Sequence, residues 1–142
     1  MVKKLSPHKK RHIARNQSIT EGIFASAKTS AGQRFIQPFA IAINSSSSLV
    51  AIFSSISGLL GSLSQLAGSK QLENKSRKKI IVQSVSLAAL MWIPLITLAF
   101  LYYKGLFVTA LPFLLLFFFA LFIIFTSYGH PAWFSWMGDI VN

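Results

Sequence analysis

The residues that could do chemistry are few, and they lie far apart along the chain. Its only acids are Glu21, Glu73 and Asp139. The 142 residues include no cysteine, and His130 has no other histidine or acid close to it in the sequence. These residues form no metal-ligand pattern, no paired catalytic carboxylates and no phosphate-binding glycine loop. We therefore expect no enzyme activity, no bound metal and no cofactor.

A second group of polar residues lies in the first apolar segment. On a helical wheel, one stripe contains Ser26, Thr29, Ser30, Gln33 and Gln37, with Arg34 at its border. One Arg at the centre of a bilayer costs about 2.5–3.5 kcal/mol on insertion scales, so this stripe should face other helices or a water-filled cavity. We predict that Gln33, Arg34 and Gln37 line such a cavity. The alternative is that Arg34 pairs with another helix.

Two charged residues of the same segment lie away from this stripe. Glu21 and Lys28 are seven positions apart and share a different face of the helix. We expect Lys28 to extend toward Glu21 and the lipid headgroups. A proton-coupled carboxylate at Glu21 is the less favoured alternative.

The elements that carry these residues have the composition of a membrane protein. Hydrophobic residues make up 53% of the chain and charged residues only 12%, about half the fraction usual in a soluble domain. Four apolar segments are each long enough to span a bilayer, which takes about 20 residues. They are residues 19–43, 49–67, 80–103 and 106–137. Short connections predict an all-α membrane protein of four antiparallel transmembrane helices, with a basic tail at 1–17 and a transmembrane domain at 18–142.

Lys and Arg residues alternate along the predicted connections. The tail has six, the link after the first segment has none, the loop at 68–79 has five, and the next link has one. Short cytoplasmic loops are enriched in Lys and Arg, so this order predicts a multi-pass protein with a cytoplasmic N-terminus. The expected location is the plasma membrane. The partner of a chain with net charge +11 is then the lipid bilayer and not nucleic acid.

Small residues and prolines add two local predictions. Ser54 and Gly58, Ser57 and Gly61, and Ser64 and Gly68 are each four positions apart. Small residues at this spacing let helices approach closely inside a bilayer. Pro94 and Pro131 lie within the third and fourth segments and are expected to kink them.

The loop and the end of the chain resemble the major facilitator superfamily of transporters. The stretch "GSKQLENKSRKKI", residues 68–80, is similar to that family's cytoplasmic loop between helices two and three. Glu73 takes the place of the loop acid, and Arg77 and Lys78 take the place of the basic pair. The stretch "PAWFSWMGDIV", residues 131–141, resembles the close of helix four through Ala132, Trp133, Asp139 and Val141. The first apolar segment also resembles that family's first helix.

The resemblance implies a fold and an activity. The fold would be the start of the N-terminal six-helix half, and the chain an N-terminal fragment with about four of twelve helices. The activity would be secondary active transport of a small solute by alternating access, ion-coupled or facilitative. Gln33, Arg34 and Gln37 would then help line the substrate cavity. Glu73, Arg77, Lys78 and Asp139 would form a cytoplasmic gating latch, in which Arg77 bonds Asp139. The alternative is that the charge of Arg77 only helps to set the orientation of the helices in the membrane.

The partners implied are a small-molecule solute, a coupling ion, and the missing transporter half or another membrane subunit. A different reading stays open beside this one. The chain could be a stand-alone four-helix membrane protein that binds a partner or self-assembles without transport. The small residues of the second segment suit that reading as well.

Overall fold

The computed structural model describes the backbone of residues 7–141, and every regular element in that range is helical. The elements are α1 (Pro7–Ala31), the 3-10 helix η1 (Gln33–Phe35), α2 (Ile36–Ala42), α3 (Ser47–Gln71), α4 (Arg77–Leu90), α5 (Trp92–Tyr103), α6 (Leu111–Tyr128) and α7 (His130–Val141).

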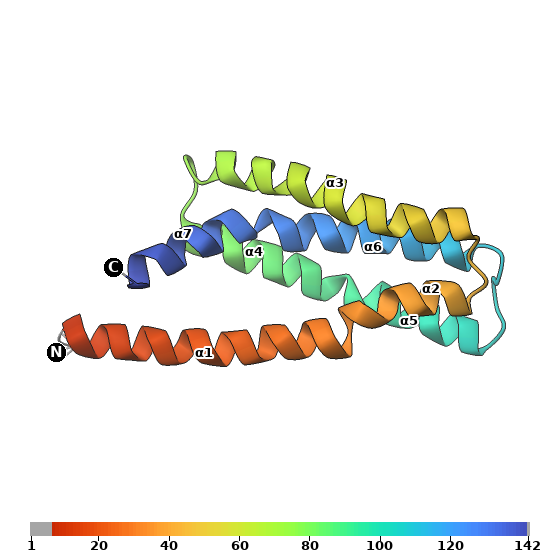
Figure 1. The fold of residues 1–142 in the computed structure, drawn as a ribbon, viewed down its shortest axis with the longest axis horizontal. Coiled ribbons are helices and arrows are strands. Elements are labelled where there is room, and N and C mark those ends of the chain that lie inside the picture. Colours follow the sequence, from red (N-terminus) through yellow and green to blue (C-terminus); the bar gives the residue numbers. More distant parts are fainter. Residues whose placement is uncertain (1–6, 142) are drawn as a thin grey trace.

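These elements form four rods that run along one long axis (Figure 1). The first rod consists of α1, η1 and α2, and the second is α3. The third joins α4 to α5, and the fourth joins α6 to α7. The start of α1, the turn at 72–76 and the end of α7 lie at one end of the bundle, and the turns at 43–46 and 104–110 lie at the other. Successive rods are therefore antiparallel.

Prolines account for where most of the helices begin. All five prolines of the chain lie in the first turn of a helix, and they are Pro7, Pro38, Pro94, Pro112 and Pro131. Proline has no N–H to donate, so it is tolerated in the first turn, where that donor would have no helical acceptor. The kinks expected at Pro94 and Pro131 appear as breaks between α4 and α5 and between α6 and α7.

The first rod differs from its predicted bounds. Its helix begins at Pro7 and not near residue 19, so residues 7–17 of the expected tail are helical. Lys and Arg favour helix almost as well as Ala, which fits this extension. The helix then breaks at Gly32, before η1. A Cβ at Gly32 would collide with the ring of Trp92, so the missing side chain lets the first and third rods approach there.

The fourth rod begins later than predicted, at Leu111 and not near residue 106. Gly105 and Phe107 adopt left-handed backbone angles, with φ of 68° and 54°. A residue in this conformation interrupts a right-handed helix. The segment at 104–110 is therefore a turn.

All four rods contribute to the core, which is rich in aromatic side chains where the second rod meets the fourth. Phe53 and Phe122 are fully buried, and the rings of Phe53 and Phe119 lie 5.5 Å apart. Outside this core, large apolar side chains cover the bundle surface, including Leu63, Ile93 and Phe113. An apolar surface of this extent is typical of a protein that faces lipid.

Three helical stretches are long and apolar enough to cross a membrane. Within the described residues, they are Ser47–Gln71, Arg77–Tyr103 and Leu111–Asp139, with 25, 27 and 29 residues. They coincide with the second, third and fourth rods, and together with the apolar surface they indicate a membrane protein. The first rod, which was also predicted to span, is not among them.

Candidate functional site

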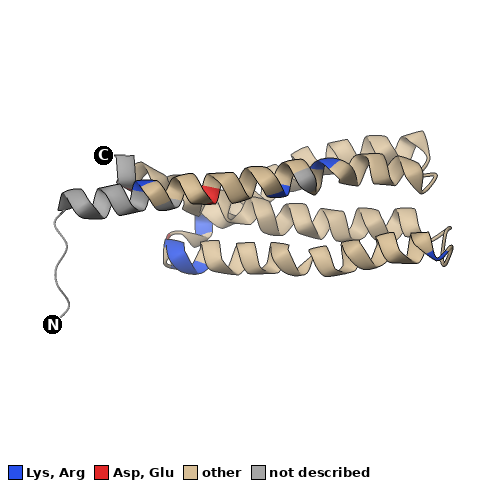
Figure 2. Cartoon of the chain, turned by 90° about the horizontal axis from the view of Figure 1, so that it is seen from below, with Lys and Arg blue, Asp and Glu red and all other residues tan. Residues whose placement is uncertain are grey.

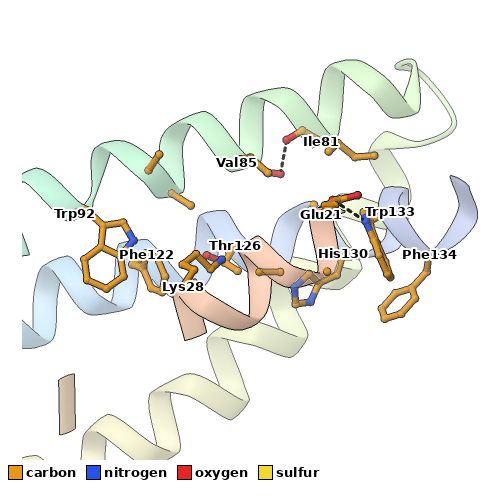
Figure 3. A pocket seen from close by; sticks show the side chains of 16 residues that line it. Glu21, Lys28, Ile81, Val85, Trp92, Phe122, Thr126, His130, Trp133 and Phe134 are labelled. Carbon is orange, nitrogen blue, oxygen red and sulfur yellow. Dashed lines mark hydrogen bonds between the residues drawn. The ribbon is translucent and has the colours of Figure 1, made fainter. Parts of the chain in front are cut away.

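A cavity of about 470 Å³ lies between α1, α4 and the fourth rod (Figure 3). Its wall on α4 is mostly apolar and includes Ile81, Val85 and Ala88, with Ser84 among them. Trp92 and Phe122 close its inner end and meet edge to face, with ring centroids 5.6 Å apart. Binding sites for small molecules are usually cavities of this size with mostly apolar walls and a few polar groups.

A hydrogen bond between α1 and α7 fixes the acid of the cavity. The indole N–H of Trp133 donates to Oε1 of Glu21, with 2.9 Å between the two atoms. One turn before Glu21 on α1, the hydroxyl of Ser18 donates to the sulfur of Met137 at 3.6 Å. These two contacts hold the first rod against the fourth, and they leave Glu21 oriented at the cavity wall.

The other polar groups of the cavity have fewer partners. The ammonium of Lys28 lies 5.9 Å from the centroid of the Phe122 ring, and Lys28 makes no ion pair among the described residues. Thr126 lies one turn beyond Phe122 on α6, and its hydroxyl oxygen is buried without a hydrogen-bond partner in the described part of the chain. His130 follows after four more residues and also lines the cavity.

An ion pair joins α4 to α7 beyond the cavity. The guanidinium of Arg77 binds the carboxylate of Asp139 and also donates to the backbone carbonyl of Ser135 at 3.5 Å. The two side chains are 43% and 65% exposed, so the pair contributes only about 0–1 kcal/mol. A contact this weak can open and close reversibly.

The pair and the cavity are neighbours along both helices. Ile81, in the cavity wall, lies one turn after Arg77, and Trp133 lies six residues before Asp139. The pair therefore stands between the cavity and the end of the bundle that carries the 72–76 turn.

The structure brings together two of the four residues assigned to the latch. Arg77 and Asp139 are in contact. Glu73, in the 72–76 turn, and Lys78, in the first turn of α4, are exposed and form no ion pair among the described residues.

The three residues expected to line a substrate cavity lie elsewhere. Arg34 is exposed, Gln33 is half-buried, and the amide of Gln37 donates to the hydroxyl of Ser54 on α3 at 3.3 Å. None of them contributes to the cavity described above. Their role in binding a solute stays a prediction.

Two of the residues that line the cavity could be related to each other from the sequence alone. Glu21 and Lys28 share one helical face, and both line it. Their partners on the fourth rod could not be read from spacing, since Trp133 is 112 positions from Glu21. Within the described residues, no group of three or more His, Asp or Glu side chains is placed to hold a metal ion.

Comparison with known proteins yields no relative. No family model, no curated protein and no solved structure matches the chain. Function is therefore inferred from the residues and their geometry.

Proposed function

We propose that this chain is a four-pass plasma-membrane protein with a cytoplasmic N-terminus that forms part of a secondary transporter for a small solute. The observation that carries the proposal is the ion pair between Arg77 and Asp139, which joins residues 62 positions apart. The resemblance to the major facilitator superfamily assigns these two residues to one latch. No catalytic step belongs to this proposal.

The distribution of charge supports the orientation. Lys70, Lys75, Arg77, Lys78 and Lys79 lie at the end of the bundle that carries the 72–76 turn (Figure 2). In the turns at the opposite end, at 43–46 and 104–110, the only cation is Lys104. Ends rich in Lys and Arg stay in the cytoplasm. The N-terminus then lies on the cytoplasmic side together with the latch.

The position of the pair supports a gating role. Separation of α4 from α7 at Arg77 would open a path from the cytoplasm to the cavity. Because the pair is exposed, breaking it costs little, and the closed state is favoured without being locked. This is the behaviour that alternating access requires of a cytoplasmic contact.

A double-mutant cycle with a cysteine reporter tests the latch. The chain has no cysteine, so Ser84→Cys introduces a single thiol in the cavity wall. In this background, Arg77→Gln and Asp139→Asn should each speed labelling by N-ethylmaleimide several-fold. The double variant should be no faster than either single variant, because both changes remove the same contact.

Lys78→Gln is the matched control, since it removes a neighbouring cation that makes no ion pair among the described residues. It should leave the labelling rate unchanged. Additive effects of Arg77→Gln and Asp139→Asn, or an equal effect of Lys78→Gln, would count against the latch.

A second candidate is a subunit that assembles with another membrane protein, or with its own copies, without transport. The observation that favours it is the exposure of Arg34 in η1, between α1 and α2 of the first rod. A cation on a lipid-facing surface is costly, so a second protein that covers this face would stabilise it.

Crosslinking distinguishes self-assembly from the other readings. Ser30→Cys lies one turn before Arg34, and Ser55→Cys on α3 is an exposed control outside the polar stripe. If copies of the chain associate through the stripe, oxidation in membranes should join Ser30→Cys chains into dimers and leave Ser55→Cys monomeric. Equal crosslinking at both positions would show random collision instead.

A further inference from the structure

Some polar side chains of the cavity have a hydrogen-bonding or charged partner and others have none in the described part of the chain. The side chains without a partner indicate what a ligand would have to supply. The acid of the cavity, Glu21, already accepts a hydrogen bond from Trp133. Lys28 lies two turns further along α1 and makes no ion pair among the described residues. The buried hydroxyl of Thr126 has no partner in the same range. Besides the exposed imidazole of His130, the groups without a partner in this range are thus a cation and a hydroxyl.

Both groups lie near Phe122. Lys28 stands over the ring of Phe122, and Thr126 is one turn along the same face of α6 (Figure 3). Phe122 lies near the middle of the apolar stretch Leu111–Asp139. A lysine at this depth is costly in lipid unless an anion or a polar group accompanies it. A bound anion would meet that requirement, and the Thr126 hydroxyl could donate to the same group.

The remaining side chains of the cavity wall indicate the chemical character of the rest of the ligand. Ile81, Val85 and Ala88 on one side and Trp92 and Phe122 at the inner end are apolar. These side chains match a hydrocarbon or aromatic body. At the outer end, the carboxylate of Glu21 would repel a second negative charge.

We propose that the cavity binds a monocarboxylate with an apolar body, whose carboxylate contacts Lys28 and Thr126. The inference concerns binding alone and does not depend on transport or on the latch. A cationic ligand fits less well, because its positive charge would have to lie in the same cavity as Lys28. Such an acid could come from the aqueous phase or, as a fatty acid, from the bilayer.

Intrinsic tryptophan fluorescence can measure binding to the purified full chain in detergent, because two of its three tryptophans line the cavity. The probes are 3-phenylpropionate, its neutral amide, 3-phenylpropylamine and decanoate. We expect saturable binding of 3-phenylpropionate and binding at least about tenfold weaker for the amide and the amine, because only the carboxylate completes a charge pair. Saturation by decanoate alone would support the same site and identify the bilayer as the source of the acid.

The variant that tests the site is Lys28→Met, which keeps the length of the side chain and removes its charge. It should weaken carboxylate binding by at least about tenfold, while Lys104→Met, at the opposite end of the bundle, should bind as the parent does. Tighter binding of the amine than of the acid, unchanged binding by Lys28→Met, or no binding of either carboxylate would overturn the proposal.

Two further variants keep the test decisive if Lys28→Met does not fold. Lys28→Arg preserves the charge and should retain most of the carboxylate affinity. Thr126→Val removes only the hydroxyl. It should weaken binding of the acid several-fold and leave the weak binding of the amine unchanged. Equal effects of Thr126→Val on the acid and the amine would mean that the hydroxyl shapes the cavity without contacting the carboxylate, and would contradict the proposed contact.

Discussion

Thr126 carries a hydroxyl group that is buried in the wall of the cavity and has no hydrogen-bond partner in the described part of the chain. Helical threonines commonly donate to the carbonyl four residues earlier, as Thr97 does to Ile93 at 2.9 Å. A buried polar group without a partner is destabilising, so each one in a folded protein calls for an explanation, such as a functional role or a bound ion.

Removing the hydroxyl of Thr126 should therefore raise the stability of the unliganded protein and lower its affinity for the carboxylate. Thr126→Val replaces the hydroxyl with a methyl group of similar size and should stabilise the unliganded protein by about 1 kcal/mol. Thermal unfolding in detergent, followed by circular dichroism, measures this as a higher midpoint temperature. The control is Thr97→Val, which removes a satisfied hydroxyl and should give no such gain. A lower midpoint for Thr126→Val would show that its hydroxyl has a partner.

The residues of the site were only partly accessible to sequence reasoning. Arg77 and Asp139 could be chosen because short motifs surround each of them, and the structure places them in contact. Glu21 and Lys28 could be placed on one face because helical periodicity is local. The contact between Glu21 and Trp133 depends on how two distant helices pack, and no local pattern encodes it.

At the scale of the helices, α3 packs closely against the fourth rod through its small residues. Gly61, Ser64 and Gly68 are buried on this face. A Cβ at Gly68 would collide with the backbone carbonyl of Tyr128, whereas a Cβ at Gly58 would meet nothing within 4 Å. The sequence predicted a packing role for all of these small residues. Only the structure separates those that contact the fourth rod from those with free space around them.

Two glycine substitutions on the same helix should consequently have opposite effects. Gly68→Ala forces α3 away from the backbone of the fourth rod and should destabilise the bundle by about 1–3 kcal/mol. Gly58→Ala keeps the contacts, improves helix propensity, and should stabilise by up to about 1 kcal/mol. The midpoint of thermal unfolding separates the two cases. Similar midpoints for both variants would mean that α3 is not packed as described.

The existence of the helices was easier to predict than their breaks. Long apolar runs predicted all-helical structure in the second, third and fourth rods, because a membrane-spanning segment must satisfy its backbone hydrogen bonds internally. The interruption at Gly32 and the turn through Phe107 depend on tertiary packing and on backbone angles that the residue types alone do not dictate. The helical start at Pro7 was missed because charge was read as a sign of a tail.

At the scale of the whole molecule, the two ends of the bundle differ strongly in charge. This difference predicts the topology. In intact cells, a membrane-impermeant maleimide should label Ser48→Cys, near the 43–46 turn, and should label Ser76→Cys only after permeabilisation. Both serines are exposed, so access to the reagent differs only by the side of the membrane. The reverse labelling pattern would place the N-terminus outside and would also remove the cytoplasmic latch.

The polar character of α1 has a consequence for how the protein is synthesised. The first rod leaves the ribosome before the others, yet Glu21, Lys28 and Arg34 oppose its transfer from the translocon into lipid. Its contacts with Trp133 and Met137 belong to α7, which emerges 112 or more residues later. We therefore expect the other three rods to enter the bilayer before the first rod is integrated, so that the order of insertion differs from the order of translation.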